Sequence, residues 1–127
     1  MADRNLRFAL KELGLVACGA VPGAWLRWQS GVHLGPLLGG SAISNLLVNV
    51  IGSLILGFLA GPIPRRPSLL LLLGIGFCGC LTTFSSWMLD VVKLINAGQP
   101  VLGLLLIVLS LLLGVASAAA GFQLSRR

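Results

Sequence analysis

A row of polar side chains runs through an otherwise apolar stretch near the middle of the chain. The row consists of Ser41, Asn45, Asn49 and Ser53. A spacing of four residues places them near one face of a helix. An asparagine amide in hydrocarbon costs free energy unless it is hydrogen-bonded. Two interpretations stay open: the row holds neighbouring helices together, or it lines a polar pathway.

A second candidate for chemistry is a glycine-rich run that ends in two threonines. Residues 74–87 read Gly-Ile-Gly-Phe-Cys-Gly-Cys-Leu-Thr-Thr-Phe-Ser-Ser-Trp. Glycine and threonine are poor helix formers, so we predict a break in the helix near Gly79 to Thr83. Broken backbone in a membrane frees polar groups, which protein or an ion pathway must satisfy. The alternative is a glycine-rich face that serves only helix packing.

Two charges also lie within apolar stretches. Arg27 follows the small residues Gly19 and Gly23, and Asp90 lies seven residues beyond Thr83. Charges inside a membrane usually face a cavity or a partner. They can instead sit at the interfaces, where a long side chain reaches water. Both interpretations stay open for each residue.

The elements that position these residues follow from composition. The chain is 57% hydrophobic and 9% charged, whereas a soluble domain carries about 25% charged residues. We therefore predict an all-α integral membrane protein, a single domain over residues 1–127. A span needs about 20 apolar residues, and we expect no cleaved signal peptide. The four expected spans are residues 6–28, 41–59, 68–95, and a last one that follows a loop at 96–100 and ends near Leu124.

Loops and packing surfaces complete this outline. Residues 30–40, rich in Gly, Pro and Ser, are expected to form a loop, as is the proline-rich stretch 61–67. The last span carries small residues on one side, which predicts close helix packing; Ser110 can also offer its hydroxyl to a pathway. These small residues are Gly103, Ser110, Gly114, Ser117 and Gly121.

Several function classes are disfavoured. The net charge is +6, but the basic residues are scattered and no nucleic-acid motif is present, so no nucleic-acid partner is expected. Cys18, Cys78 and Cys80 are interpreted as reduced packing residues, too few to ligate a metal. His33 is alone in its loop. No nucleophile–base pair occurs, so the protein is not expected to be an enzyme.

Three segments together resemble the Fluc/CrcB family of fluoride channels. They are residues 19–27 (Gly-Ala-Val-Pro-Gly-Ala-Trp-Leu-Arg), 47–57 (Leu-Val-Asn-Val-Ile-Gly-Ser-Leu-Ile-Leu-Gly) and 76–87, which contains Thr-Thr-Phe-Ser. The resemblance covers all four spans. It implies an antiparallel dimer of four-helix subunits with two pores along the interface, through which cytoplasmic fluoride leaves passively. It also implies a multi-pass protein of the prokaryotic plasma (inner) membrane.

The resemblance further assigns residues. It places a structural sodium ion on the backbone carbonyls of Gly79 and Thr82, where Gly79 is expected to need a conformation disfavoured for residues with a Cβ. The chain departs from the family by carrying Trp87 for Phe, Cys80 for Gly and Asp90 for Glu. The indole N–H of Trp87 is expected to be available as an extra donor. The fluoride pathway is assigned to Asn49, Phe84, Trp87, Thr83, Ser85, Ser110 and Arg27.

Rival functions and the dimer partner need separate treatment. A small multidrug exporter needs a membrane carboxylate; Glu12 is a candidate, but it adjoins Lys11 and the chain has no tyrosine. A non-transporting assembly subunit would not explain the asparagines.

Basic residues crowd the side of the membrane that holds the termini, which favours one orientation, whereas an antiparallel homodimer needs both. We favour the homodimer and keep a heterodimer as the alternative. The crowded side holds Arg4, Arg7, Lys11, Arg65, Arg66, Arg126 and Arg127, against Arg27 and Lys93 opposite.

Overall fold

The computed structural model describes residues 2–61 and 66–126, and side chains from Asn5 onward. In this part of the chain every regular element is helical, and four helices are long and apolar enough to cross a membrane. The all-α membrane fold is therefore confirmed. The first, second and fourth spans are α1 (Ala2–Leu37), α2 (Ser41–Leu59) and α6 (Pro100–Leu124). The third span consists of four consecutive elements: α3 (Pro67–Leu69), η1 (Leu70–Cys78), α4 (Gly79–Leu81) and α5 (Ser85–Asn96).

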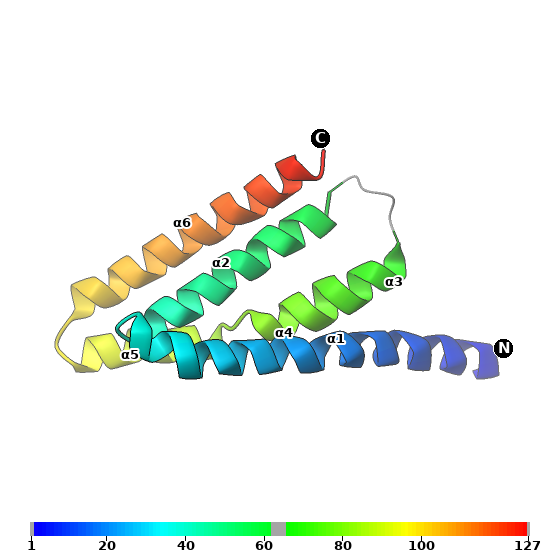
Figure 1. The fold of residues 1–127 in the computed structure, drawn as a ribbon, viewed down its shortest axis with the longest axis horizontal. Coiled ribbons are helices and arrows are strands. Elements are labelled where there is room, and N and C mark those ends of the chain that lie inside the picture. Colours follow the sequence, from blue (N-terminus) through cyan, green and yellow to red (C-terminus); the bar gives the residue numbers. More distant parts are fainter. Residues whose placement is uncertain (1, 62–65, 127) are drawn as a thin grey trace.

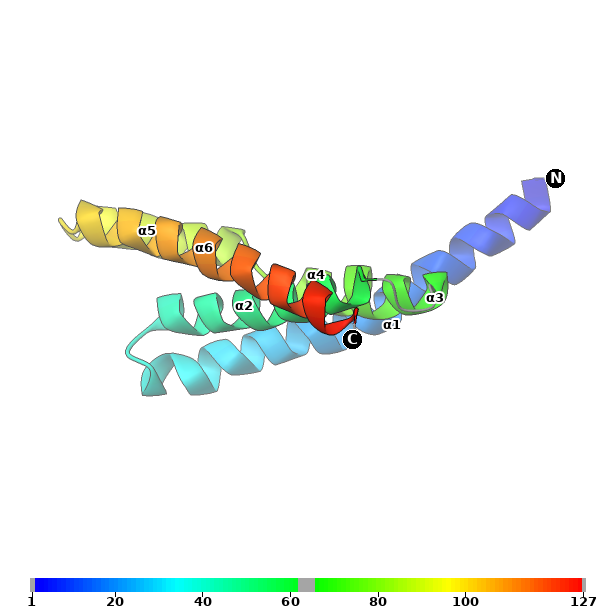
Figure 2. The ribbon, with the colours of Figure 1, turned by 90° about the horizontal axis from the view of Figure 1, so that it is seen from above.

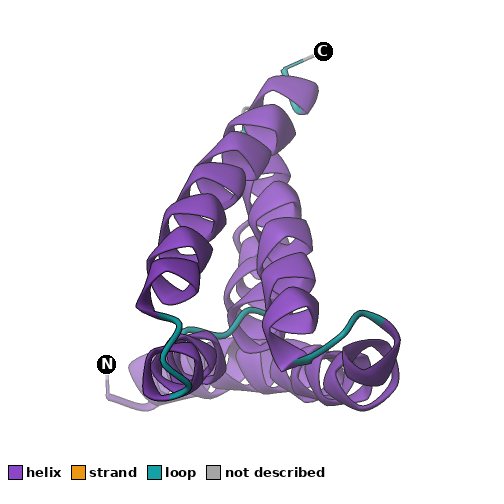
Figure 3. Cartoon of the chain, turned by 90° about the vertical axis from the view of Figure 1, so that its left-hand side faces the viewer, coloured by secondary structure: helices purple, strands orange, loops and turns teal. Residues whose placement is uncertain are grey.

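The helices form two closely packed pairs. α2 lies along α6, and η1 lies along α1. Both termini lie at one end of the molecule, while the turns between α1 and α2 and between α5 and α6 lie at the other (Figure 1). Seen from that turn end, α2 and α6 rise from a base formed by α1 and α5 (Figure 3). η1 of the third span thus belongs to one pair, whereas α5 packs against α6 of the other pair. The interruption lies between them.

Glycines let the backbones of each pair approach. A Cβ on Gly23 of α1 would collide with the carbonyl of Phe77 in η1, and one on Gly121 of α6 would collide with the carbonyl of Leu54 in α2. Close approach through small residues is the usual way that helices associate in a membrane. The predicted packing role of the small residues in the last span is therefore confirmed at Gly121.

The first span is longer than predicted. α1 continues to Leu37, so the loop expected at residues 30–40 is wrong for most of its length. The side chains of Val32, Leu34 and Leu37 are exposed on this chain, and backbone facing lipid must satisfy its own hydrogen bonds, which favours helix over loop. A tight turn remains, in which Gly39 and Gly40 adopt φ values of 83° and 146°. The N-terminal part of α1 projects well beyond the other helices (Figure 2).

The third span is interrupted, as predicted, but at the end of the expected window. Residues 82–84 lie between α4 and α5, and Thr82 is extended with φ −71° and ψ 153°. Gly79 is helical, with φ −62° and ψ −31°, so the expectation that it needs a disfavoured conformation is wrong. The glycine-rich stretch before it forms the wide helix η1, whose hydrogen bonds follow the π pattern. Its Gly76 serves packing, since a Cβ there would lie 2.6 Å from the carbonyl oxygen of Val16.

Candidate functional site

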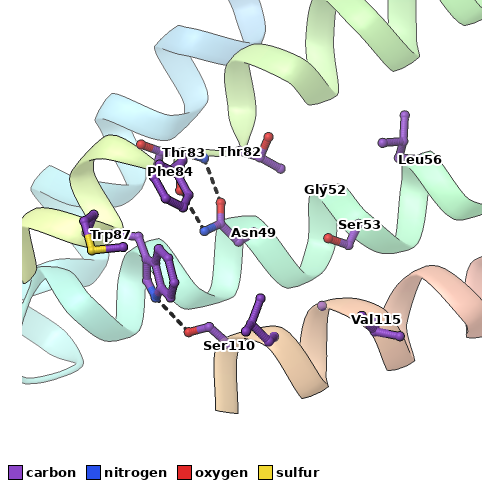
Figure 4. A pocket seen from close by; sticks show the side chains of 13 residues that line it. Asn49, Gly52, Ser53, Leu56, Thr82, Thr83, Phe84, Trp87, Ser110 and Val115 are labelled. Carbon is purple, nitrogen blue, oxygen red and sulfur yellow. Dashed lines mark hydrogen bonds between the residues drawn. The ribbon is translucent and has the colours of Figure 1, made fainter. Parts of the chain in front are cut away.

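Asn49 of α2 holds the backbone at the interruption. Its Nδ2 donates to the carbonyl oxygen of Thr83 at 2.9 Å, and its Oδ1 accepts from the backbone N–H of Thr83 at 2.7 Å. Figure 4 shows the two bonds side by side. One amide therefore replaces both helical hydrogen bonds that this residue has lost, which is why the interruption is tolerated in the membrane.

The two hydrogen bonds of Asn49 form a clamp on Thr83, and this clamp leaves neighbouring carbonyl groups without their helical partners. In an α-helix the Thr83 N–H would bind the carbonyl of Gly79, but it binds Asn49 instead. The Ser86 N–H would bind the carbonyl of Thr82, but it donates to Thr83 Oγ1 at 3.2 Å. The carbonyl oxygen of Thr82 accepts from Nη1 of Arg27 at 3.3 Å. The interruption thus frees the carbonyl oxygen of Thr82 for a positively charged group on α1.

Two other members of the polar row bind Asp90. Ser41 Oγ donates to Oδ1 of the carboxylate, and Asn45 Nδ2 donates to Oδ2, both at 2.6 Å. Asp90 is 4% exposed, and the Nζ of Lys93 lies 3.5 Å away. The row therefore has two uses: Ser41 and Asn45 hold α2 to α5, and Asn49 holds the interruption. Asp90 faces partners inside the protein rather than snorkelling to an interface.

A groove of about 540 Å³ opens beside the clamp, between α2, the start of α5 and α6. Within it, Trp87 Nε1 donates to Ser110 Oγ at 2.8 Å, and the rings of Phe84 and Trp87 are 5.5 Å apart at 53° (Figure 4). The rest of the wall is largely apolar and includes Leu56, Met88, Leu111 and Val115. Few polar groups on apolar walls are typical of a site for a small solute.

The groove brings together most of the predicted pathway residues, namely Asn49, Thr83, Phe84, Trp87 and Ser110. Two do not line it: Ser85 is exposed on the first turn of α5, and Arg27 contacts the carbonyl of Thr82. Their roles in a pathway stay predictions.

One expectation about the groove is wrong, and some lining residues were not predicted. The indole N–H of Trp87 is not available as a spare donor because Ser110 accepts it. Ser53 of the polar row also lines the groove, as does Gly114, for which only a packing role was expected. The available signal for Gly114 was its position, four residues beyond Ser110 on the same helical face.

The fold and the groove together define a multi-pass membrane protein built around an interrupted third span. Residues 14–122 match the family described as "CrcB-like protein, Camphor Resistance (CrcB)". The chain belongs to this family.

The "Fluoride-specific ion channel FluC 2" of Synechococcus sp. (strain CC9605) is 54% identical over 126 residues, covering 99% of this chain and 89% of the relative. That of Parasynechococcus marenigrum (strain WH8102) is 57% identical, covering 96% and 86%. The same strain has a "Fluoride-specific ion channel FluC 1", which is 37% identical and covers 89% and 92%.

Proposed function

We propose that this chain is a subunit of a fluoride-selective channel in the bacterial inner membrane, through which cytoplasmic fluoride leaves passively. The observation that carries the proposal is the donor-lined groove at the interruption, with Asn49, Thr83 and Ser110 on apolar walls. Relatives that are 54% and 57% identical are named fluoride-specific ion channels, not enzymes. Fluoride is small and strongly hydrated, so a pathway must replace its water with close donors.

The chain's own groups can supply these donors. An amide nitrogen carries two hydrogens, and Asn49 uses one of them on Thr83. Phe84 can present the positive edge of its ring to the ion. Arg27 attracts anions toward the interruption by its charge, and Ser85 on the first turn of α5 offers a further hydroxyl. The apolar wall favours an ion that has shed its water over one that carries a full hydration shell.

A second subunit in antiparallel orientation completes the pathway. Phe84 is 71% exposed on the single chain, although it lies at the centre of the third span. A facing subunit would cover it and give the groove its missing wall, forming two pores per dimer. The partner is either a second copy of this chain or a different chain. The second option is favoured by two strains that each have both a FluC 1 and a FluC 2 relative.

A structural sodium ion fits the carbonyl oxygens at the interruption. Those of Gly79 and Thr82 have lost their helical partners to Asn49 and Thr83, and oxygen ligands suit a hard cation. The guanidinium of Arg27 lies 3.3 Å from the carbonyl oxygen of Thr82. When sodium binds, Arg27 must therefore share this oxygen with the ion or move away from it. Sodium would offset the negative ends of these carbonyl groups. Purified protein should then have a higher thermal midpoint in sodium than in equimolar N-methylglucamine, and an unchanged midpoint would refute the ion.

Efflux from liposomes tests the function. Protein purified together with the subunit that completes its dimer, a second copy or a different chain, and reconstituted in vesicles loaded with potassium fluoride should release fluoride once valinomycin dissipates the membrane potential. Vesicles loaded with chloride should retain their ion. A proton gradient should be unnecessary. Movement of fluoride only under an imposed proton gradient would make the protein a coupled exporter instead, in which case Glu12→Gln is the first variant to examine.

A further inference from the structure

Two of the hydroxyl groups that line the groove, those of Thr83 and Ser110, accept a hydrogen bond from a neighbouring N–H group. A serine or threonine hydroxyl can donate a hydrogen bond to an anion or accept one from a cation's water shell. A neighbouring N–H group biases this choice, because it occupies one acceptor site of the oxygen and the hydroxyl hydrogen cannot point toward it. Trp87 Nε1 donates to Ser110 Oγ at 2.8 Å, and the backbone N–H of Ser86 donates to Thr83 Oγ1 at 3.2 Å. Each oxygen therefore already accepts, and its own hydrogen points elsewhere.

The direction of the Ser110 hydroxyl hydrogen decides whether this side chain can donate to a solute in the groove. Serine in a helix often donates to the carbonyl four residues back, as Thr82 does here to Cys78 at 2.9 Å. Within the described residues Ser110 makes no bond of that kind; its hydroxyl accepts from Trp87 and lines the groove. Figure 4 shows both side chains beside the clamp of Asn49. The hydrogen of Ser110 is therefore free to meet a solute in the groove.

We propose that the indole N–H of Trp87 is a positioning group that orients Ser110 as a hydrogen-bond donor and thereby strengthens the binding of an anion in the groove. Trp87 acts through Ser110 and does not itself bind the ion through this N–H. Accepting a hydrogen bond also polarises the hydroxyl, which strengthens the bond that it donates. The inference rests on the proposed function, since it assigns polarity to the same groove.

A phenylalanine at this position would remove the constraint. Without the N–H, the oxygen of Ser110 would have an open acceptor side, and the hydroxyl could turn its hydrogen back to its own helix. The side chain would then offer a fluoride ion no fixed donor. Compared with phenylalanine, tryptophan therefore keeps an aromatic ring in the groove wall and adds an N–H group that orients the hydroxyl of Ser110.

A double-mutant cycle of fluoride efflux tests the coupling. Trp87→Phe should lower the rate about 5-fold, the equivalent of one hydrogen bond, and should cause no further loss in a Ser110→Ala background. A purely steric role for the ring would give the same loss in both backgrounds, and independent effects of the two changes would overturn the proposal. Trp25→Phe, on the exposed surface of α1, is the matched control and should conduct like the parent.

Fluorescence gives a second readout that does not depend on transport. The chain has three tryptophans, so Trp25→Phe with Trp28→Phe leaves Trp87 as the only emitter. Its emission should shift on titration with sodium fluoride but not sodium chloride, and Ser110→Ala should abolish the shift. Emission unaffected by fluoride, in protein that releases fluoride from vesicles, would overturn the proposal. Failure of the parent to release fluoride, with either a second copy or a different chain as its partner, would count against the proposed function instead.

Discussion

Asn49 binds Thr83 through both ends of its amide, so either end can be altered separately. The oxygen end accepts the backbone N–H at 2.7 Å, and the nitrogen end donates to the carbonyl at 2.9 Å. Aspartate has nearly the same shape but no donor. It would keep the first bond and set a negative oxygen against the carbonyl of Thr83 and against any anion in the groove.

Asn49→Asp should therefore reduce fluoride efflux at least about 10-fold, because it removes a donor and adds repulsion beside the pathway. The measurement is efflux from liposomes, with gel filtration to confirm that the variant has the same oligomeric state as the parent. Ser53→Ala, four residues further along the same face of α2, is the control and should lose much less. If well-folded Asn49→Asp protein conducts like the parent, Asn49 does not line the pathway.

Asp90 is the other residue whose loss has a clear structural cost. It is 4% exposed and accepts bonds of 2.6 Å from Ser41 and Asn45. Asp90→Ala leaves these two donors without an acceptor, and we expect a loss of about 2–4 kcal/mol in stability. Asp90→Asn keeps the shape and one acceptor, so its thermal midpoint in detergent should fall between those of the parent and Asp90→Ala. Equal midpoints for all three proteins would show that the contacts between α2 and α5 contribute nothing.

At the scale of single residues, the sequence predicts which side chains share a helical face better than it predicts which groups they contact. The spacing of Asn45 and Asn49 predicts a shared face, but the assignment of one to Asp90 and the other to Thr83 depends on where α5 begins. The bond between Trp87 and Ser110 joins residues 23 apart on two helices. Such a bond depends on the crossing of α5 and α6, which no local pattern specifies.

At the scale of helices, glycine positions separate packing from open surface. Gly23 and Gly31 are both in α1, but a Cβ on Gly23 would meet the Phe77 carbonyl, whereas nothing lies within 4 Å of one on Gly31. Gly23→Ala should therefore destabilise the fold by about 1–3 kcal/mol. Gly31→Ala should be neutral or stabilising by up to about 1 kcal/mol. Thermal midpoints measured in the same detergent check the pair, and similar midpoints would argue against a close contact of α1 with η1.

Gly79 gives a further comparison within the third span. It is helical, and the nearest atom that a Cβ at this position would meet is the carbonyl oxygen of Gly74, 3.9 Å away. Gly79→Ala should therefore fold and conduct nearly as the parent does. Misfolding of this variant would mean that a contact outside the single chain restricts the position. The measurement is gel filtration followed by fluoride efflux.

Hydropathy locates all four spans, and it places α2 at residues 41–59 as observed. It fails at the end of α1, because Gly, Pro and Ser in residues 30–37 are typical of loops in water, whereas a lipid-facing backbone favours helix. The interruption is predictable from the threonines, but its position follows from the clamp of Asn49. Its glycines serve mainly packing, as Gly76 shows.

At the scale of the whole molecule, the charges bear on the choice of partner. Arg27 does not count as a charge of the turn end, because it bonds to the centre of the third span and lies about 15 Å before the end of α1. The charged amine of Lys93 at the turn end is next to Asp90. At the end with the termini, the described basic side chains are those of Arg7, Lys11, Arg66 and Arg126.

This asymmetry predicts one orientation, with both termini in the cytoplasm, because cytoplasmic segments are enriched in Lys and Arg. An antiparallel dimer of a chain with one orientation needs a different chain as its partner. A FluC 1-type relative, of the kind found beside FluC 2 in two strains, is the candidate. A C-terminal tag should then be protected from outside in every cell. Fluoride efflux should require co-expression of the second chain. Tags in equal amounts on both sides, with efflux by this chain alone, would instead establish the homodimer.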